Sequence, residues 1–149
     1  MKRFLILLLC TSLLFACNQA PDKSKDDKHV INNIKQTTEL ALNNGTKWKA
    51  DSVTNHNVAN LRGIADDFKT EPAPSVSDYQ KLSADLNTGL NKMIKECKMT
   101  GADHDALHIW LQPILEENAE LKNISATEIA GTIFKSIDKR LDNYNNYFE

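Results

Sequence analysis

The stretch from Tyr79 to Cys97 reads YQKLSADLNTGLNKMIKEC, and it decides the fold. Its apolar residues recur at every third or fourth position, which places them on one face of a helix. A stripe of this kind predicts an amphipathic helix that buries one face against other helices. The residues of the stripe are Tyr79, Leu82, Leu86, Leu90, Met93 and Cys97.

Helical patterns also flank this stretch. Upstream, the sequence predicts a weaker helix that ends at Asn43-Asn44-Gly45 and a longer one over 47–68. Downstream, Thr100-x-x-Asp103 and Ser125-Ala126-Thr127-Glu128 resemble capping boxes, which begin helices. The sequence therefore predicts an all-α, antiparallel up-down four-helix bundle over residues 29–149. The last helix is expected to bury Ile129, Ile133, Ile137, Leu141, Tyr144 and Phe148.

The N-terminus has the features of a bacterial lipoprotein signal. Basic residues precede an apolar run that ends at Phe15 and is too short to span a bilayer comfortably. Leu14-Phe15-Ala16-Cys17 then resembles a lipoprotein cleavage site, at which the sulfur of Cys17 would carry a diacylglycerol. We expect a signal peptide over 1–16 and a lipid-anchored protein of the bacterial cell envelope. The alternative is an ordinary signal peptide that leaves Cys17 as a free thiol.

Composition limits the partners. Residues 17–28 carry no large apolar side chain, so they are expected to form a flexible tether to the domain that begins at His29. The net charge of the chain is −2, and removing Lys2 and Arg3 with the leader lowers it to −4. No basic patch is visible, which argues against a nucleic-acid or anionic-lipid partner.

The segment CKMTGADHDALH, from Cys97 to His108, brings a thiol, a thioether and two imidazoles close together in sequence. His104 and His108 are four residues apart, so both can lie on the same face of a helix. The turn at Thr100-Gly101 would bring Cys97 back toward that face, and Met99 could point inward as a weak extra ligand. We expect a metal site of Cys97, Met99, His104 and His108, which His56 could complete from across the bundle.

Cysteine usage supports this expectation. Cys10 leaves with the leader and Cys17 is acylated, so Cys97 is the only thiol of the exported form. Cysteine, methionine and two histidines are the ligand set of blue-copper sites, and soft sulfur ligands favour copper. Zinc or a non-covalent haem are alternatives, although a thioether suits zinc less well. The simplest competing interpretation is that Cys97 and Met99 are core residues and that both histidines are solvated.

Two segments are similar to uncharacterised small exported helical (lipo)proteins of Bacteroidetes-type bacteria. They are Leu42-Asn43-Asn44-Gly45-Thr46-Lys47-Trp48-Lys49-Ala50 and Cys97-x-Met99-x-Gly101-x-x-His104-x-x-Leu107-His108-x-Trp110-Leu111-x-Pro113. The resemblance covers most of the mature domain. It implies that the second segment acts as one unit, and it adds no activity.

Three functions compete at this point. The first is an anchored copper-binding protein for electron transfer, buffering or delivery, with a metal-donor or redox partner protein. The second is a structural or interaction lipoprotein in which the motif only stabilises a helical hairpin. The third is a thiol redox sensor at Cys97. No catalytic constellation is apparent, which argues against an enzyme.

Overall fold

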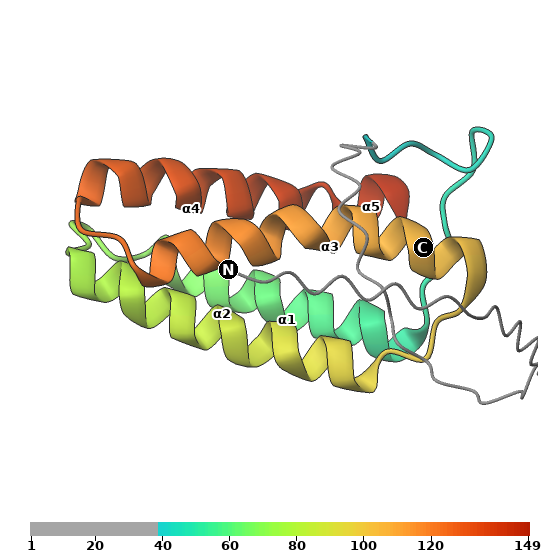
Figure 1. Ribbon diagram of the computed structural model, residues 1–149, viewed down its shortest axis with the longest axis horizontal. Helices are drawn as coiled ribbons and strands as arrows, with labels where there is room; N and C mark the ends of the chain where they lie inside the picture. The colour runs from blue at the N-terminus through green and yellow to red at the C-terminus, as the bar shows by residue number, and fades with distance from the viewer. Residues whose placement is uncertain (1–38) are drawn as a thin grey trace, which may run out of the picture. The chain divides into compact units, whose positions relative to one another are not determined.

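The computed structural model describes residues 39–149, all of which belong to one compact unit, Gln36–Glu149. The predicted signal peptide, the lipidation site Cys17, the tether and His29 lie outside the described residues. The helices are α1 (Ser52–Phe68), α2 (Val76–Glu96), α3 (Gly101–Lys122), α4 (Thr127–Asp142) and the short α5 (Tyr144–Tyr147) (Figure 1).

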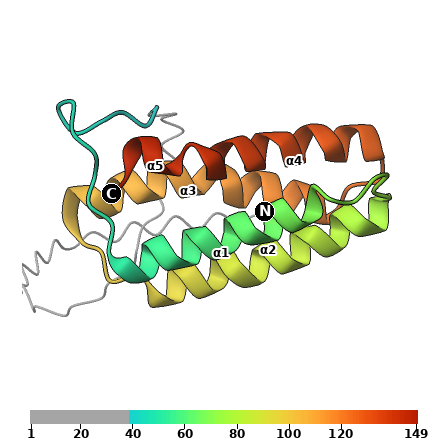
Figure 2. The same cartoon turned by 180° about the vertical axis from the view of Figure 1, so that it is seen from behind.

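The four long helices form an antiparallel bundle. Each packs against the next one along the chain, and α1 also packs against α4, which closes the bundle. Figures 1 and 2 show α1 and α2 in one layer and α3 and α4 in the other. The structure confirms the predicted all-α up-down four-helix bundle. Across residues 39–149, no helix combines the length and apolar character that crossing a bilayer requires.

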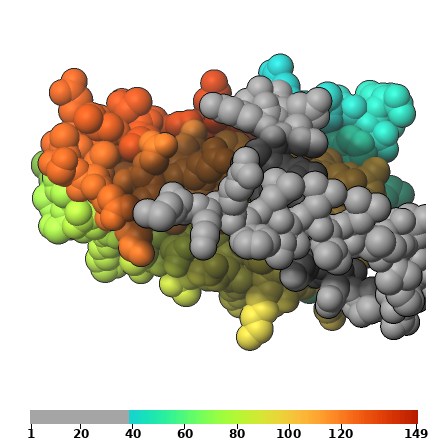
Figure 3. Space-filling model, viewed as in Figure 1, coloured from blue at the N-terminus to red at the C-terminus, as the bar shows by residue number. Residues whose placement is uncertain are grey.

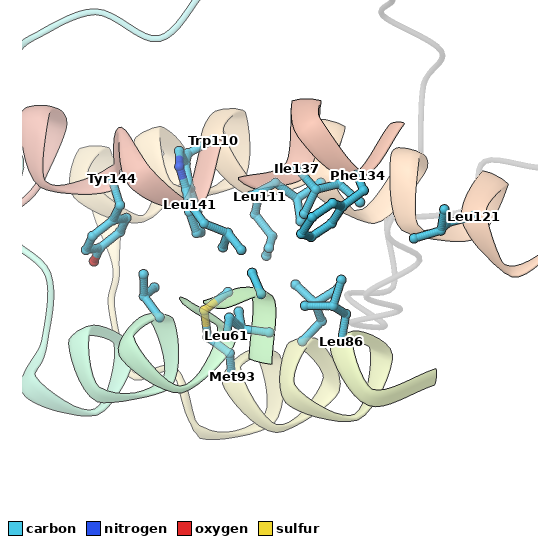
Figure 4. Packing of buried hydrophobic residues seen from close by; sticks show 14 of the residues in the cluster. Leu61, Leu86, Met93, Trp110, Leu111, Leu121, Phe134, Ile137, Leu141 and Tyr144 are labelled. Carbon is cyan, nitrogen blue, oxygen red and sulfur yellow. The ribbon is translucent and has the colours of Figure 1, made fainter. Parts of the chain in front are cut away.

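The predicted stripe of α2 lies at the centre of the core. Its members from Tyr79 to Met93 are buried, as predicted, whereas Cys97 at its end is only half-buried. Figure 4 shows Leu61 of α1 and Leu86 and Met93 of α2 pointing toward the layer formed by α3 and α4. The bundle is therefore held together by apolar contacts between its two layers.

The described segment before α1 is not helical, whereas the sequence predicted helix on both sides of Asn43-Asn44-Gly45; the part of the first predicted helix before residue 39 lies outside the described residues. Residues 39–42 are not helical, and α1 begins only at Ser52. Residues 47–50 run beside residues 147–149, and the pairing hydrogen bonds between the two backbones are 2.8–3.0 Å long. We call these paired segments the strap. Because the backbone groups of the strap find partners outside a helix, α1 cannot begin until the chain has passed it.

The buried face of α4 differs from the prediction at its N-terminal end. Ile129 is 57% exposed, and Ala130 and Phe134 are buried instead. Each step of four residues moves a side chain about 40° around the axis of an α-helix. A stripe that stays on one buried face must therefore alternate steps of four and three residues. The expected capping box at Ser125 is also absent, because Ala126 is the N-cap residue and makes no side-chain capping bond.

The connections of the bundle lie at its two opposite ends. Gln80 Nε2 donates to the carbonyl of Ile124 at 3.0 Å, which joins the N-terminal part of α2 to the α3–α4 connection. The space-filling view shows the side chains of these two regions in contact (Figure 3). The α2–α3 connection and the strap lie at the other end (Figure 1). This second end carries the candidate site.

At Gly89, α2 lies close to a side chain of α1. A Cβ atom added at Gly89 would lie 2.7 Å from Leu61 Cδ2, and Leu61 is fully buried. We predict that Gly89→Ala lowers the free energy of unfolding by about 1–2 kcal/mol, because overpacking outweighs the gain in helix propensity. Urea unfolding of the full chain measures the change.

Gly63→Ala is the matched control for this variant. Gly63 is exposed in α1, and an added Cβ would meet nothing within 4 Å. The substitution should therefore raise the free energy of unfolding, by up to about 1 kcal/mol. A stabilised Gly89→Ala protein would contradict the close packing of α1 on α2.

Candidate metal centre

The chain turns sharply between α2 and α3. The N–H of Cys97 donates to the carbonyl of Met93 at 2.9 Å, and the ψ of Cys97, 130°, takes the backbone out of α2. Gly101 begins α3 with a φ of 68°, a conformation that other residues adopt only with strain. Thr100 is the N-cap residue, but its side chain makes no capping bond. The predicted capping box of Thr100 with Asp103 is therefore not formed.

Two carboxylates tie this turn to the segment before α1. Asp51 accepts hydrogen bonds from the N–H of Thr54 at 2.6 Å and from the N–H of Lys98 at 2.9 Å. Asp103 accepts from the N–H of Lys49 at 2.9 Å and so points away from its predicted partner, Thr100. We call Asp51, Asp103 and their donors the carboxylate clasp. It positions the first turn of α3, which carries the first histidine.

The clasp depends on the charge of Asp51. Partial burial by itself would raise the pKa of the Asp51 carboxyl, but the N–H groups of Thr54 and Lys98 lower it, and the resulting pKa lies below its usual value. Hydrogen bonds that are donated to a carboxylate favour its ionised form. The folded state therefore prefers Asp51 to be charged.

His104 and His108 form a pair on α3. Their Nε2 atoms are 3.1 Å apart, and the two rings meet edge to face with centroids 4.4 Å apart. At this distance the two Nε2 atoms share one hydrogen bond, in which one ring donates its Nε2–H and the other accepts with a bare Nε2. His104 is half-buried and His108 is exposed. The predicted convergence of these two imidazoles is confirmed.

The spacing of the pair suits a shared metal ion. Two nitrogens that bind one ion at about 2.0–2.1 Å with tetrahedral angles lie roughly 3.3 Å apart. The observed separation of 3.1 Å is close to this value. The two Nε2 atoms are therefore close enough to bind one ion if each ring turns its nitrogen toward it.

A pocket of about 180 Å³ lies between α2 and α3 beside this pair. Cys97, His104 and His108 all line it, so three of the four predicted ligands share one pocket. Its other walls are mostly apolar and include Leu107 and Leu111. We call it the α2–α3 pocket.

The structure separates the remaining candidates from this pocket. Met99 is half-buried against the core and does not line the pocket. His56 is exposed on α1 and does not line the pocket either. Met93 lines it as well, although its place in the apolar stripe of α2 predicts only a core residue. Its spacing of four residues from Cys97 was the signal that could have revealed it.

The donor groups are not yet gathered around one point. Among residues 39–149, no three side chains of His, Cys, Asp or Glu are grouped so that they could hold a metal ion. The preformed part of the site is thus the histidine pair. A third ligand would have to come from Cys97 by rotation of its side chain.

We predict that Asp51→Ala lowers the free energy of unfolding by about 2–3 kcal/mol. The substitution removes the cap of α1 and leaves the N–H of Lys98 without its acceptor. Asp67→Ala is the matched control, because Asp67 is an exposed carboxylate of α1 and its loss should change the value by less than about 0.5 kcal/mol. Urea unfolding of the full chain measures both variants.

The pH dependence of stability tests the charge of Asp51 separately. Because the pKa of Asp51 is lower in the folded than in the unfolded protein, its contribution is fully present above about pH 4. The contribution is lost as the pH falls through the folded pKa. We therefore predict that Asp51→Asn loses less stability than the wild type between about pH 5 and about pH 2. Identical pH profiles would show that the ionised carboxylate contributes nothing.

No protein-family model, curated protein or solved structure matches the chain. The similarity of two segments to exported proteins of Bacteroidetes-type bacteria stays a prediction.

Proposed function

We propose that the protein binds a soft transition metal ion in the α2–α3 pocket, with copper as the preferred ion. The observation that carries the proposal is the 3.1 Å separation of the Nε2 atoms of His104 and His108. Both imidazoles can bind through Nε2 while their protons move to Nδ1. The thiol of Cys97, which lines the same pocket, is the third ligand.

The chemistry of the pocket supports copper over the alternatives. A thiolate is a soft ligand, and soft ligands favour cuprous copper. Zinc also binds cysteine and histidine side chains, but its preference for soft ligands is weaker. The pocket volume of about 180 Å³ is below the ~300 Å³ at which pockets for small organic ligands begin. A single ion therefore fits better than a non-covalent haem.

The exposure of the site supports a role in buffering or delivery. His108 is exposed, so an ion held by it can be exchanged with solvent or with a metal-donor protein. The lipoprotein signal at Cys17 is the basis for proposing that this exchange takes place at a membrane of the cell envelope. We propose a lipid-anchored copper-binding protein in preference to an electron-transfer protein.

Anaerobic titration of the reduced full chain with Cu⁺, in competition with a colorimetric chelator, tests this proposal. We predict that His104→Leu and His108→Leu each weaken Cu⁺ binding by roughly a hundredfold, since even the loss of a group that only orients a ligand costs 10–100-fold. His56→Leu is the matched control, because it removes an exposed imidazole outside the pocket. Equal binding by all three variants would refute the proposal.

Cys97→Ser tests the thiol in the same titration. We predict that Cu⁺ produces an ultraviolet thiolate-to-metal band in the wild type and that this band is reduced in Cys97→Ser. Cys10 and Cys17 are present in both full chains, so the difference reports Cys97 alone. Identical affinities and spectra would exclude the thiol from the site.

A second candidate function is a structural or interaction role for the same motif. It is favoured by the carboxylate clasp and by the contacts of Cys97 and Met99 with the core. An ion that binds only the folded protein raises its melting temperature, and a chelator reverses the effect. A melting temperature of the reduced protein that responds to neither Cu⁺ nor chelator would favour the structural role.

A further inference from the structure

We infer that Met93, and not Met99, supplies the thioether of the site, and that four ligands together select cuprous ion. The inference rests on the proposed function and identifies its fourth ligand. Met93 lines the α2–α3 pocket together with Cys97, His104 and His108, and Met99 does not. The four ligands form two pairs, each with a spacing of four residues: Met93 of α2 with its C-cap residue Cys97, and His104 with His108 on α3.

The spacing places both sulfur residues on one face of α2. Met93 precedes Cys97 by four residues, so the two side chains lie one above the other on that face. The same spacing brings the Nε2 atoms of His104 and His108 to within 3.1 Å on α3. Because α2 and α3 pack against each other, the two pairs meet at the pocket between them.

Burial distinguishes Met93 from Met99. Met93 is 1% exposed, and Figure 4 shows its sulfur among the core side chains between the two layers. Its position is therefore set by the packing of the bundle. Met99 lies in the α2–α3 connection and is only half-buried. A methionine has three rotatable side-chain bonds, so the sulfur of Met93 can turn toward an ion without movement of the backbone.

The charge of the complex favours Cu⁺ over a divalent ion. When Cu⁺ binds, the thiol of Cys97 loses its proton to solvent, and the bond from sulfur to copper joins one negative to one positive charge. The thioether and the two imidazoles are neutral, so the complex with Cu⁺ is neutral overall. The same ligands around Zn²⁺ or Cu²⁺ leave one positive charge beside the apolar walls at Leu107 and Leu111, which costs desolvation energy.

Met93→Leu and Met99→Leu separate the two thioethers. Both substitutions keep the approximate volume of the side chain, so the fold should survive, and far-UV circular dichroism with urea unfolding verifies this. In the anaerobic competition titration of the reduced full chain, we expect Met93→Leu to weaken Cu⁺ binding by on the order of tenfold. Zn²⁺ binding by Met93→Leu should change less than about twofold, because a thioether is a poor ligand for zinc. Met99→Leu should affect neither ion.

X-ray absorption of the Cu⁺ complexes provides a direct count of the sulfur ligands. The wild type and Met99→Leu should show two sulfur and two nitrogen ligands, and Met93→Leu should show one sulfur ligand fewer. Loss of Cu⁺ affinity and of a sulfur ligand in Met99→Leu alone would overturn the inference in favour of Met99. If the wild type binds Cu⁺ and neither variant differs from it, no thioether is a ligand and only this inference fails. Failure of the wild type to bind Cu⁺ at all would overturn the proposed function as well.

Discussion

The carboxylate of Asp51 is the constraint on which the arrangement of the site depends. One oxygen caps the N-terminus of α1, and the other holds the backbone of the α2–α3 turn. Each N–H would otherwise need a partner from solvent, and a carboxylate bonds such donors more strongly than a neutral acceptor does. The single side chain therefore joins the first helix to the turn between the second and third. Together with the hydrogen bond from Lys49 to Asp103, it couples the start of α3, and so the first histidine, to the segment at the start of α1.

The two imidazoles of the histidine pair are already adjacent, whereas among the described residues no third ligand is gathered around the same point. The two imidazoles share one proton in the hydrogen bond between their Nε2 atoms. A metal ion would take the place of that proton at the same two atoms. Sulfur groups beside the pair need only side-chain rotation to approach it. The spacing on α3 thus fixes the candidate nitrogen ligands, whereas the proposed sulfur ligands would have to rotate to reach an ion.

The sequence predicted those features that arise from spacing along one helix. The stripe of α2 from Tyr79 to Met93 and the approach of His104 to His108 follow from residues three or four positions apart, and the structure has both. It could not predict features that need a distant partner. Asp103 looks like a capping residue until Lys49, far away in sequence, donates to it instead. Trp48 lies in an apparently helical run, but it pairs with backbone at the end of the chain. The core position of Met93 was predicted, but its place in the pocket depends on how α3 packs on α2.

The strap has a mechanical consequence. Trp48 and Ala50 are held to Tyr147 and Glu149 by backbone hydrogen bonds, and they precede Asp51 and α1 along the chain. A pulling force that arrives from the N-terminal side therefore loads the strap before it reaches α1. Three hydrogen bonds share that load, with the buried ring of Phe148 as their support. The strap thus protects the bundle from tension. Its hydrogen bonds must break before a pulling force can disturb the carboxylate of Asp51 and the turn that carries the candidate ligands.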